Sequence, residues 1–414
     1  MFYSHYLLNL KFMNTSYIIR SFFHLVLLIL MVNCKQTNEK EILDKLREKY
    51  RGHFSFKLNH NKQLTHVLFW DLENLNKIPE EIASFKFIEG IHINNCSLKE
   101  FNDDFFEAEN IKVIDISDNP IEQLDVSFED YTSLISLNIN NTNLKELPDE
   151  LLKNKGLEEL RFFNTKINEI PEEIFSIDSL KRLHLNYSKD IPIKLDKLKK
   201  LIMFGGKFDS LSNVQLLKNM QILIFDDSDF SVVPDTLDNF NDILFLSFRN
   251  CKNLKTLPSS IFKSLEEQQL DLDLVGCDNF KSLPKSLINS NQIGSITLDR
   301  CPNFNYFPPG MYINSIRVID ANWKNLPKNF FKTDCHDLWI DGHEFHSING
   351  IKNMKSLGFC VIINGNIEVV PKGIMELPEL HHINLENNKI RKYPQFVQRQ
   401  KQFDIALGGN PIEE

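Results

Sequence analysis

From about residue 63 onward, short runs of alternating apolar and polar residues recur at a regular spacing. In one such run Leu134, Leu137 and Ile139 are apolar with polar residues between the last two, and a Leu-Pro pair follows at Leu147. Alternation at a period of two is typical of a β-strand with one buried face. The proline fixes φ and turns the chain, and stretches such as PDELLKN and PEEIFSI then have about one turn of helical character. The pattern therefore predicts a strand followed by a short helix or turn, repeated along the chain.

The recurring motif is Leu-x-x-Leu-x-Leu-x-x-(Asn/Cys/Thr)-x-Leu, with conservative replacements at the apolar positions. Its repeats are about 22–23 residues apart, within the range of a solenoid. Its ninth position falls at sixteen places: Leu72, Cys96, Asn119, Thr142, Thr165, Ser188, Gly206, Ser228, Cys251, Cys277, Cys301, Ala321, His343, Gly365, Asn388 and Asn410. The step from Ser188 to Gly206 is short and the step from Cys251 to Cys277 is long. At both places we expect a kink or an altered outer segment.

This motif and its period resemble the leucine-rich repeat family from about Gln63 to the last residue. The Leu/Ile/Val-Pro pairs after most strands are similar to its typical and bacterial classes. The resemblance implies an α/β solenoid, a curved horseshoe with a parallel β-sheet on the concave face and short helices or 3₁₀ turns on the convex face. In the family, an asparagine at position nine bonds to neighbouring backbone, and here only Asn119, Asn388 and Asn410 keep it. No repeat can bury its own apolar face, so stability is a sum over neighbours.

The first 33 residues predict a signal peptide. They contain Lys11 and Arg20 but no acidic residue, and residues 21–32 read SFFHLVLLILMV. This apolar stretch is shorter than the roughly 20 residues that span a bilayer, and a basic residue before such a stretch is typical of a secretory signal. Cys34 follows almost directly, which resembles a bacterial lipoprotein signal in which that cysteine is lipidated. Ordinary cleavage nearby and an uncleaved anchor are the alternatives. A start at Met13 would give a leader of more usual form.

The remaining chain divides into two predicted parts. Residues 34–62 are a lipid-anchor linker and an N-terminal capping helix, because Ile42, Leu43 and Leu46 have helical spacing and the acids precede the bases in residues 38–50. Residues 63–414 are the leucine-rich repeat domain of about 16 repeats. The leader implies membrane attachment through the lipid anchor and a place in the cell envelope, as an outer membrane lipoprotein that faces the periplasm or the cell surface.

Composition argues against several functions. The formal net charge is −9, whereas nucleic-acid proteins need a basic footprint. No phosphate loop, G-x-S-x-G or H-E-x-x-H motif occurs in a credible context. His343 and His346 are one residue short of the zinc-protease spacing, on an expected turn, and are interpreted as solvated. We therefore expect no catalytic residue, no metal, no cofactor and no small-molecule substrate.

The cysteines are interpreted as structural. Of the seven, Cys34 belongs to the leader and the other six fall at core positions of the repeat. Cysteine at such a position acts as a small hydrophobe. Cys251, Cys277 and Cys301 lie in successive repeats within reach of a disulfide. Free thiols are favoured, because a buried ladder points its side chains in parallel.

Strand positions 2, 3, 5, 7 and 8 line the concave face in the family, which gives a candidate partner-binding surface. It combines exposed aromatic residues with aspartates interleaved with arginines, a mixture that favours a protein partner with basic patches and apolar anchors. Stacking of the aromatics on their neighbours and simple solubility are the alternative explanation. The candidates are Trp70, Phe163, Tyr187, Phe204, Asp226, Asp227, Arg249, Asp271, Asp273, Asp299, Arg300, Arg317, Asp320, Trp339 and Asp341.

The sequence thus predicts a non-catalytic, protein-binding scaffold, exported as a bacterial lipoprotein. Two alternatives belong to other classes. One is a carbohydrate-binding or adhesive surface protein that uses the aromatic residues for stacking. The other is an intracellular repeat scaffold whose start was assigned too early.

Overall fold

The computed structural model describes residues 37–102, 108–235, 242–263, 265, 269–396 and 403–413. These residues form two compact units, Met1–Gly156 (unit 1) and Leu157–Glu414 (unit 2), and each is described by itself. The predicted signal peptide and Cys34 lie outside the described residues. Within the described part of the chain, no helix has both the length and the apolar character needed to span a membrane.

Unit 1 begins with a cap and continues with parallel strands. The elements are α3 (Thr37–Lys49), β1 (Phe54–Leu58), β2 (Leu64–Leu72), β3 (Gly90–Cys96), β4 (Glu100–Asn102), β5 (Val113–Asp115), β6 (Gln123–Asp125), β7 (Ser136–Asn138) and α4 (Asp149–Leu152), with 3₁₀ helices η1 (Glu80–Ser84) and η2 (Ala108–Asn110). Strands β2, β3, β5 and β7 pair in parallel in that order. A second, two-stranded sheet pairs β4 with β6.

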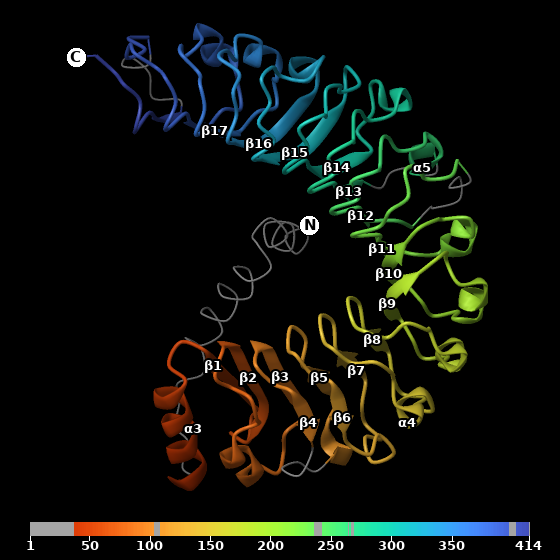
Figure 1. Cartoon of the computed structure of the whole chain (residues 1–414). Helices are drawn as coiled ribbons and strands as arrows, with labels where there is room; N and C mark the ends of the chain where they lie inside the picture. The colour runs from red at the N-terminus through yellow and green to blue at the C-terminus, as the bar shows by residue number, and fades with distance from the viewer. Residues whose placement is uncertain are drawn as a thin grey trace. The chain divides into compact units, whose positions relative to one another are not determined.

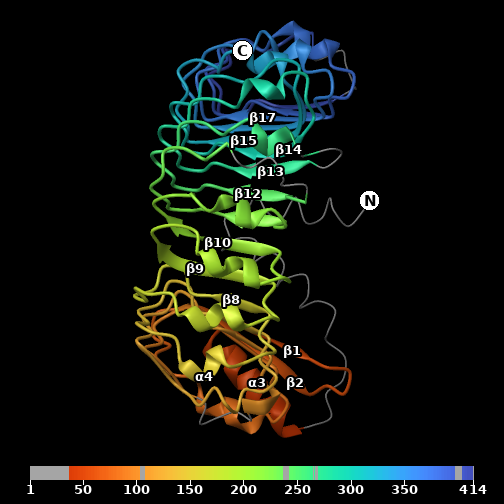
Figure 2. The same cartoon turned by 90° about the vertical axis from the view of Figure 1, so that its right-hand side faces the viewer.

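Unit 2 contains twelve strands in the described residues, paired in parallel in chain order (Figures 1 and 2). They are β8 (Glu159–Arg161), β9 (Arg182–Ser188), β10 (Met203–Phe208), β11 (Ile222–Ile224), β12 (Phe245–Ser247), β13 (Leu270–Asp273), β14 (Ile293–Thr297), β15 (Tyr312–Ile319), β16 (Asp334–Asp341), β17 (Phe359–Ile363), β18 (His382–Asn384) and β19 (Asp404–Ala406). The short helices are η3 (Glu172–Ser176), η4 (Ile193–Lys197), η5 (Val214–Leu217), α5 (Ser260–Lys263), η6 (Lys285–Leu287), η7 (Phe330–Lys332), η8 (Ile351–Asn353) and η9 (Lys372–Glu376).

The helices begin where the sequence predicts. Prolines immediately precede six of them, at Pro79, Pro148, Pro171, Pro192, Pro284 and Pro371. Proline is favoured there because its φ is already helical and its missing N–H would have no partner in the first turn. The long step between Cys251 and Cys277 contains α5, a four-residue helix of the same length as α4 in unit 1.

The strand register follows the predicted fourth position of the motif. In unit 1, Val67 pairs with Ile91, Ile91 with Ile114 and Ile114 with Leu137. In unit 2 the equivalent residues stack as Leu160, Leu183, Phe204, Leu223, Leu246, Leu272, Ile296, Ile316, Leu338, Cys360, Ile383 and Ile405. Each of these columns is buried within its own unit except at Ile405, which is partly exposed.

One repeat breaks the predicted register. Phe204 pairs with Leu183, and after a register shift Phe208 pairs with Ser188, so Phe208 and not Gly206 takes position nine. The prediction that Phe204 is exposed on the sheet face is therefore wrong, since its side chain is fully buried. The cause is the pair Gly205-Gly206, which offers no side chain to the motif, while Phe208 fills the interior beside Gly206.

The N-terminal cap is larger than the predicted helix. Helix α3 buries Leu43 and Leu46, and β1 then pairs antiparallel with β2. The ring of Tyr50 packs edge-on against Phe69 at 5.3 Å between centroids. An unpaired edge strand can pair with other chains, and β1 prevents this for β2 by pairing with it. Helix α3 covers the end of the apolar interior.

Candidate interaction surface on the open face of unit 2

In each unit, the sheet that contains the motif strands has one face on the apolar interior and one face open to solvent, which is the face that the sequence predicts as concave. Strand β16 shows the alternation: Leu338 and Ile340 are buried, while Trp339 between them is 42% exposed. Side chains at motif positions 3, 5 and 7 therefore reach the open face because successive residues of a strand point in opposite directions.

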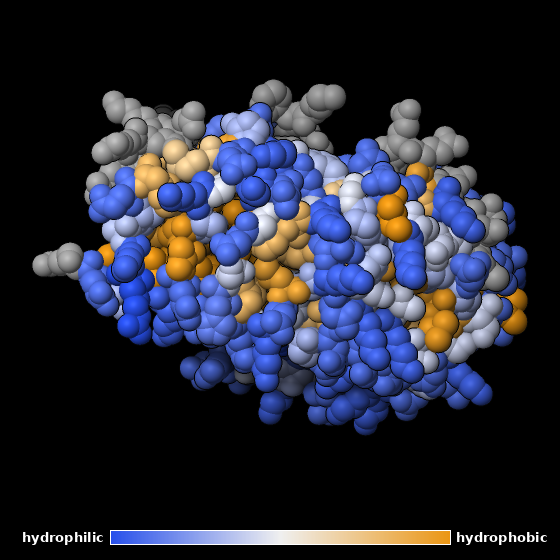
Figure 3. Space-filling view, turned by 90° about the horizontal axis from the view of Figure 1, so that it is seen from above, coloured by the Kyte–Doolittle hydropathy of each residue, from blue (hydrophilic) through white to orange (hydrophobic). Residues whose placement is uncertain are grey.

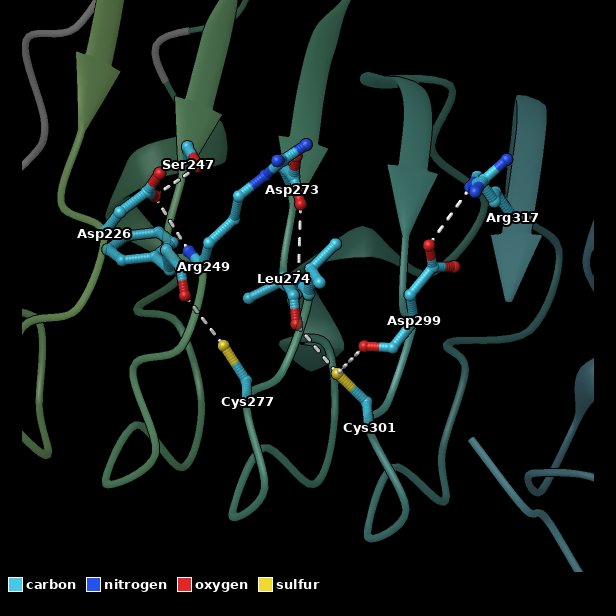
Figure 4. Close-up of polar contacts among 11 residues, drawn as sticks. Asp226, Ser247, Arg249, Asp273, Leu274, Cys277, Asp299, Cys301 and Arg317 are labelled. Atoms are coloured by element: carbon cyan, nitrogen blue, oxygen red, sulfur yellow. Dashed lines mark hydrogen bonds and ion pairs between the residues drawn. The ribbon is translucent and has the colours of Figure 1, made fainter. Parts of the chain in front are cut away.

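Two of the predicted arginines form ion pairs with predicted aspartates. Arg249 Nε donates to Asp273 Oδ2 at 2.7 Å, and Arg317 Nε donates to Asp299 Oδ2 at 3.1 Å (Figure 4). In the first pair the side chain of Asp273 is buried, whereas that of Arg249 is 42% exposed. The pairing reduces the negative charge that this part of the face offers to a partner.

The same carboxylates also hold the backbone where the chain leaves the strands. Asp226 Oδ1 accepts hydrogen bonds from Ser247 Oγ at 2.5 Å and from the Arg249 N–H at 2.9 Å. Asp299 Oδ1 accepts from the Ile319 N–H at 2.8 Å. These aspartates link neighbouring repeats, so their first role is structural.

Burial sets the protonation of this network. Loss of hydration raises the pKa of Asp226 to about 6, although Ser247 and the Arg249 N–H favour the charged form. Burial also raises the pKa of Asp299, and the neighbouring Arg317 opposes this shift. The Arg317 pair therefore compensates the desolvation of Asp299 only in part.

Asp226→Asn is expected to stabilise the protein at pH 8 and to have little effect near pH 4. Folding favours the protonated carboxyl, because its folded pKa of about 6 exceeds the ordinary value of 3.8. The penalty is thus absent below about pH 4 and complete above about pH 6, and it amounts to at most about 3 kcal/mol. Urea unfolding at several pH values measures it, with Glu379→Gln at an exposed carboxylate as control. If the difference in unfolding free energy between wild type and Asp226→Asn does not grow with pH, the raised pKa of Asp226 is contradicted.

Three predicted surface residues are turn residues. Asp227, Arg300 and Asp320 directly precede position nine and have φ of 58°, 53° and 52°. Asp227 Oδ1 accepts from Asn250 Nδ2 at 3.0 Å, and Asn95 bonds Asp71 in the same way in unit 1. Asparagine, aspartate and glycine tolerate this left-handed conformation best. Their recurrence before position nine is a sequence signal for this turn that the motif did not include.

The predicted aromatic residues do not form one exposed stripe. In unit 2, Phe163 stacks on His184 with centroids 4.6 Å apart, and Tyr187 is exposed but its hydroxyl donates to Asp209 at 2.5 Å. Trp70 belongs to unit 1 and is half-buried, with its ring 6.5 Å from that of His53. Stacking on neighbours, the alternative explanation, thus applies to Phe163.

Two large apolar side chains lie exposed on adjacent strands of unit 2. Trp339 on β16 is 42% exposed and Phe359 on β17 is 47% exposed. In the strand register, Trp339 lies between Arg317 and Val361. The ring of Phe359 lies 5.8 Å from His336 and 5.9 Å from His381. We call Trp339, Phe359 and Val361 the anchor patch.

Polar groups around the anchor patch have partners within the protein. Asp337 contacts His336 Nδ1 at 2.8 Å, and Asp341 Oδ1 accepts from Asn364 Nδ2 at 2.6 Å. Further along the sheet, Asp271 Oδ1 accepts from Ser295 Oγ at 2.6 Å. The anchor patch is therefore an apolar surface surrounded by polar groups that have partners.

The six cysteines in the described residues are free and buried, as predicted. Cys277 Sγ donates to Phe248 O at 2.9 Å, and Cys301 Sγ donates to Leu274 O at 2.8 Å (Figure 4). Asn119 Nδ2 makes the equivalent bond to Ile93 O at 2.7 Å and adds two more to its own turn. Cysteine thus keeps one bond of the asparagine ladder. Among the described residues, no group of three His, Cys, Asp or Glu side chains is arranged to hold a metal ion.

One histidine differs from the prediction. The sequence predicted His343 to be a solvated turn residue, but its side chain is buried. The reason is that it occupies position nine of its repeat, which faces the interior. Burial lowers its pKa to about 4. Its ring stacks on Phe345 with centroids 3.9 Å apart.

The parallel strands, the one-turn helices after proline and the ladder at position nine together define a leucine-rich repeat solenoid. No protein-family model matches the chain, and no curated protein matches it.

Several solved structures are similar in fold. A leucine-rich repeat protein of Leptospira interrogans is 19% identical, with 80% of this chain and 81% of that chain covered and a TM-score of 0.48. The functional domain of InlJ from Listeria monocytogenes is 12% identical, with 80% and 66% covered and a TM-score of 0.45. The Arabidopsis receptor kinase HAESA, solved with a peptide hormone and a co-receptor, is 16% identical, with 90% and 82% covered and a TM-score of 0.40. The likeness concerns the fold alone.

Proposed function

We propose that the protein is a non-catalytic scaffold that binds a protein partner on the open face of unit 2, with the anchor patch at the centre of the interface. The exposure of Trp339 and Phe359 on adjacent strands carries this proposal. Tryptophan is enriched among residues that dominate binding energy, because it buries a large area with little loss of side-chain freedom.

Hydrophobic residues also reach the surface on the side that is seen from above. They form separate patches there among hydrophilic ones (Figure 3). Isolated apolar residues such as Ile193, which is 73% exposed at the start of η4, are normal on a soluble protein. The anchor patch differs because its members are neighbours on paired strands.

Replacing Val361, the partly exposed neighbour of Trp339 in the anchor patch, with a photo-crosslinking residue tests the proposal in the native cell. We expect a discrete crosslinked protein that is lost when Phe359→Ala is added, since both side chains contact the same partner. The same crosslinker at Ile193 is the control, because this residue is exposed and lies on η4 and not on a strand of the sheet. Equal products from both positions would remove the anchor patch from consideration.

For the partner identified in this way, Trp339→Ala is expected to weaken binding about 30-fold or more, the effect of losing about 2 kcal/mol from a central aromatic anchor. The melting temperature should change little, because the side chain is 42% exposed. Isothermal titration measures the affinity, and Ile193→Ala is the matched control. Asp299→Lys is a poor test, since it would break the Arg317 pair and the bond to the Ile319 N–H.

We also propose that the scaffold is exported and anchored by a lipid on Cys34 in the outer membrane. The support is the basic start, the apolar stretch of residues 21–32 and the cysteine that follows. Mass spectrometry of the native protein tests the lipid, and protease treatment of intact cells, with lysed cells as control, tests the exposure. An unmodified N-terminus at Met1 or Met13 would contradict export and favour an intracellular scaffold.

A further inference from the structure

Unit 1 carries a second sheet with an open edge. Strands β4 and β6 pair in parallel with Glu100 opposite Gln123 and Asn102 opposite Asp125 (Figure 1). Among the described residues, β6 pairs with β4 alone. In the next repeat, the segment that corresponds to β6 leads into Pro148 and α4. It does not continue the sheet, since proline has no N–H to donate to a ladder of strand hydrogen bonds.

The open edge of β6 presents backbone groups to solvent. The Glu122 N–H donates to Lys99 O at 3.0 Å, so this N–H group points toward the repeat that contains β4. Because successive residues of a strand point their N–H groups in opposite directions, those of Gln123 and Asp125 face the other way. An unpaired strand edge of this kind is a template for another extended segment.

A groove of about 580 Å³ runs beside this edge, lined by residues 122–126 on one wall and 144–150 on the other. Its floor includes the buried side chains of Leu144 and Leu147. The groove thus combines a free strand edge, a small apolar floor and room for a chain segment, which are the features of strand addition.

Charge decides which segment fits. Five carboxylates line the groove, from Glu122, Asp125, Glu146, Asp149 and Glu150, against one cation, Lys145. None of the five takes part in an ion pair within the described part of the chain. Opposite charges across an edge steer and orient a partner, and like charges reject one.

We propose that this groove binds an extended, lysine- or arginine-rich segment of a partner protein, which adds as a strand to β6. Backbone hydrogen bonds from the N–H groups of Gln123 and Asp125 to the segment align it. The five carboxylates select its basic side chains. This surface lies in unit 1 and is separate from the anchor patch of unit 2, so the two can fail independently.

A capped eight-residue peptide that alternates lysine and valine tests the proposal on the full chain by fluorescence anisotropy. We expect saturable binding and slower amide exchange at residues 123–125. The same peptide methylated on every backbone nitrogen keeps its charge but has no N–H groups, and should bind at least tenfold more weakly. A glutamate-valine peptide should not bind.

The double substitution Glu122→Lys and Glu146→Lys reverses one exposed charge on each wall of the groove. It should lower the affinity for the lysine-valine peptide at least tenfold. Glu344→Lys with Glu379→Lys makes the same change in net charge at exposed positions of unit 2 and should leave binding unchanged. Circular dichroism confirms that both variants fold. Equal binding of the methylated peptide, equal weakening by both variants, or no binding to the wild type would each overturn the proposal.

Discussion

Phe225→Ala is expected to lower the free energy of unfolding of unit 2 by about 3–5 kcal/mol, the cost of emptying a large aromatic site. The Phe225 ring lies 6.0 Å from Phe208, 5.6 Å from Phe248 and 6.2 Å from Phe230, measured between centroids. Phe208 and Phe248 come from the repeats before and after that of Phe225, and Phe230 belongs to the same repeat. In a solenoid each repeat touches only its neighbours, so the cavity weakens the coupling between them directly.

Urea unfolding followed by near-UV circular dichroism measures the loss, and hydrogen exchange in β10, β11 and β12 locates it. Ile193→Ala is the control, because it also shortens an apolar side chain but at an exposed site, and should change stability by less than about 0.5 kcal/mol. Equal effects of the two substitutions would mean that the aromatic cluster does not couple the repeats.

Gly365→Ala is expected to cost about 1–3 kcal/mol, because a methyl group at this position would collide with a buried ring. A Cβ on Gly365 would lie 2.1 Å from His343 Nε2 in the preceding repeat. The backbone of Gly365 does not have a positive φ, so the cost arises from the contact and not from the conformation of alanine.

A double-mutant cycle separates this collision from other effects. His343→Ala removes the ring, so adding Gly365→Ala to it should cost at least about 1 kcal/mol less than adding it to the wild type. Gly156→Ala is the control, since the nearest atoms to its Cβ would be 3.3 and 3.7 Å away. Additive costs for His343 and Gly365 would show that their proximity does not matter.

The same pairing recurs elsewhere. A Cβ on Gly90 would lie 2.2 Å from the ring of His66, and one on Gly358 would lie 2.7 Å from His336. In each case the glycine occupies the strand position of the histidine one repeat later. A periodic motif predicts which position a residue occupies, but it does not predict that a large side chain leans over the next repeat.

The sequence predicted most of the strand register because the apolar fourth position recurs in nearly every repeat. It failed at the repeat of Phe204, where two glycines removed the usual signal and a register shift gave position nine to Phe208. The N-terminal helix was predicted, whereas strand β1 was not, since its pairing with β2 depends on a turn outside the repeat.

The candidate surface was predicted less well than the fold. Of its aromatic members in unit 2, Phe204 is buried and Phe163 stacks on His184, while Trp339 is exposed. Position in a motif gives the face of the sheet on which a side chain begins. Its exposure depends on which side chains the two neighbouring strands supply.

By itself, the sequence determined the solenoid and the burial of the six cysteines in its repeats, because each depends on a local pattern repeated many times. Only the tertiary structure decided which polar groups remain available to a partner. Asp273 and Asp299 are paired with arginines from adjacent repeats, and β6 has an open edge because the next repeat enters a helix at Pro148. Both facts depend on contacts between repeats, which the pattern of a single repeat does not contain.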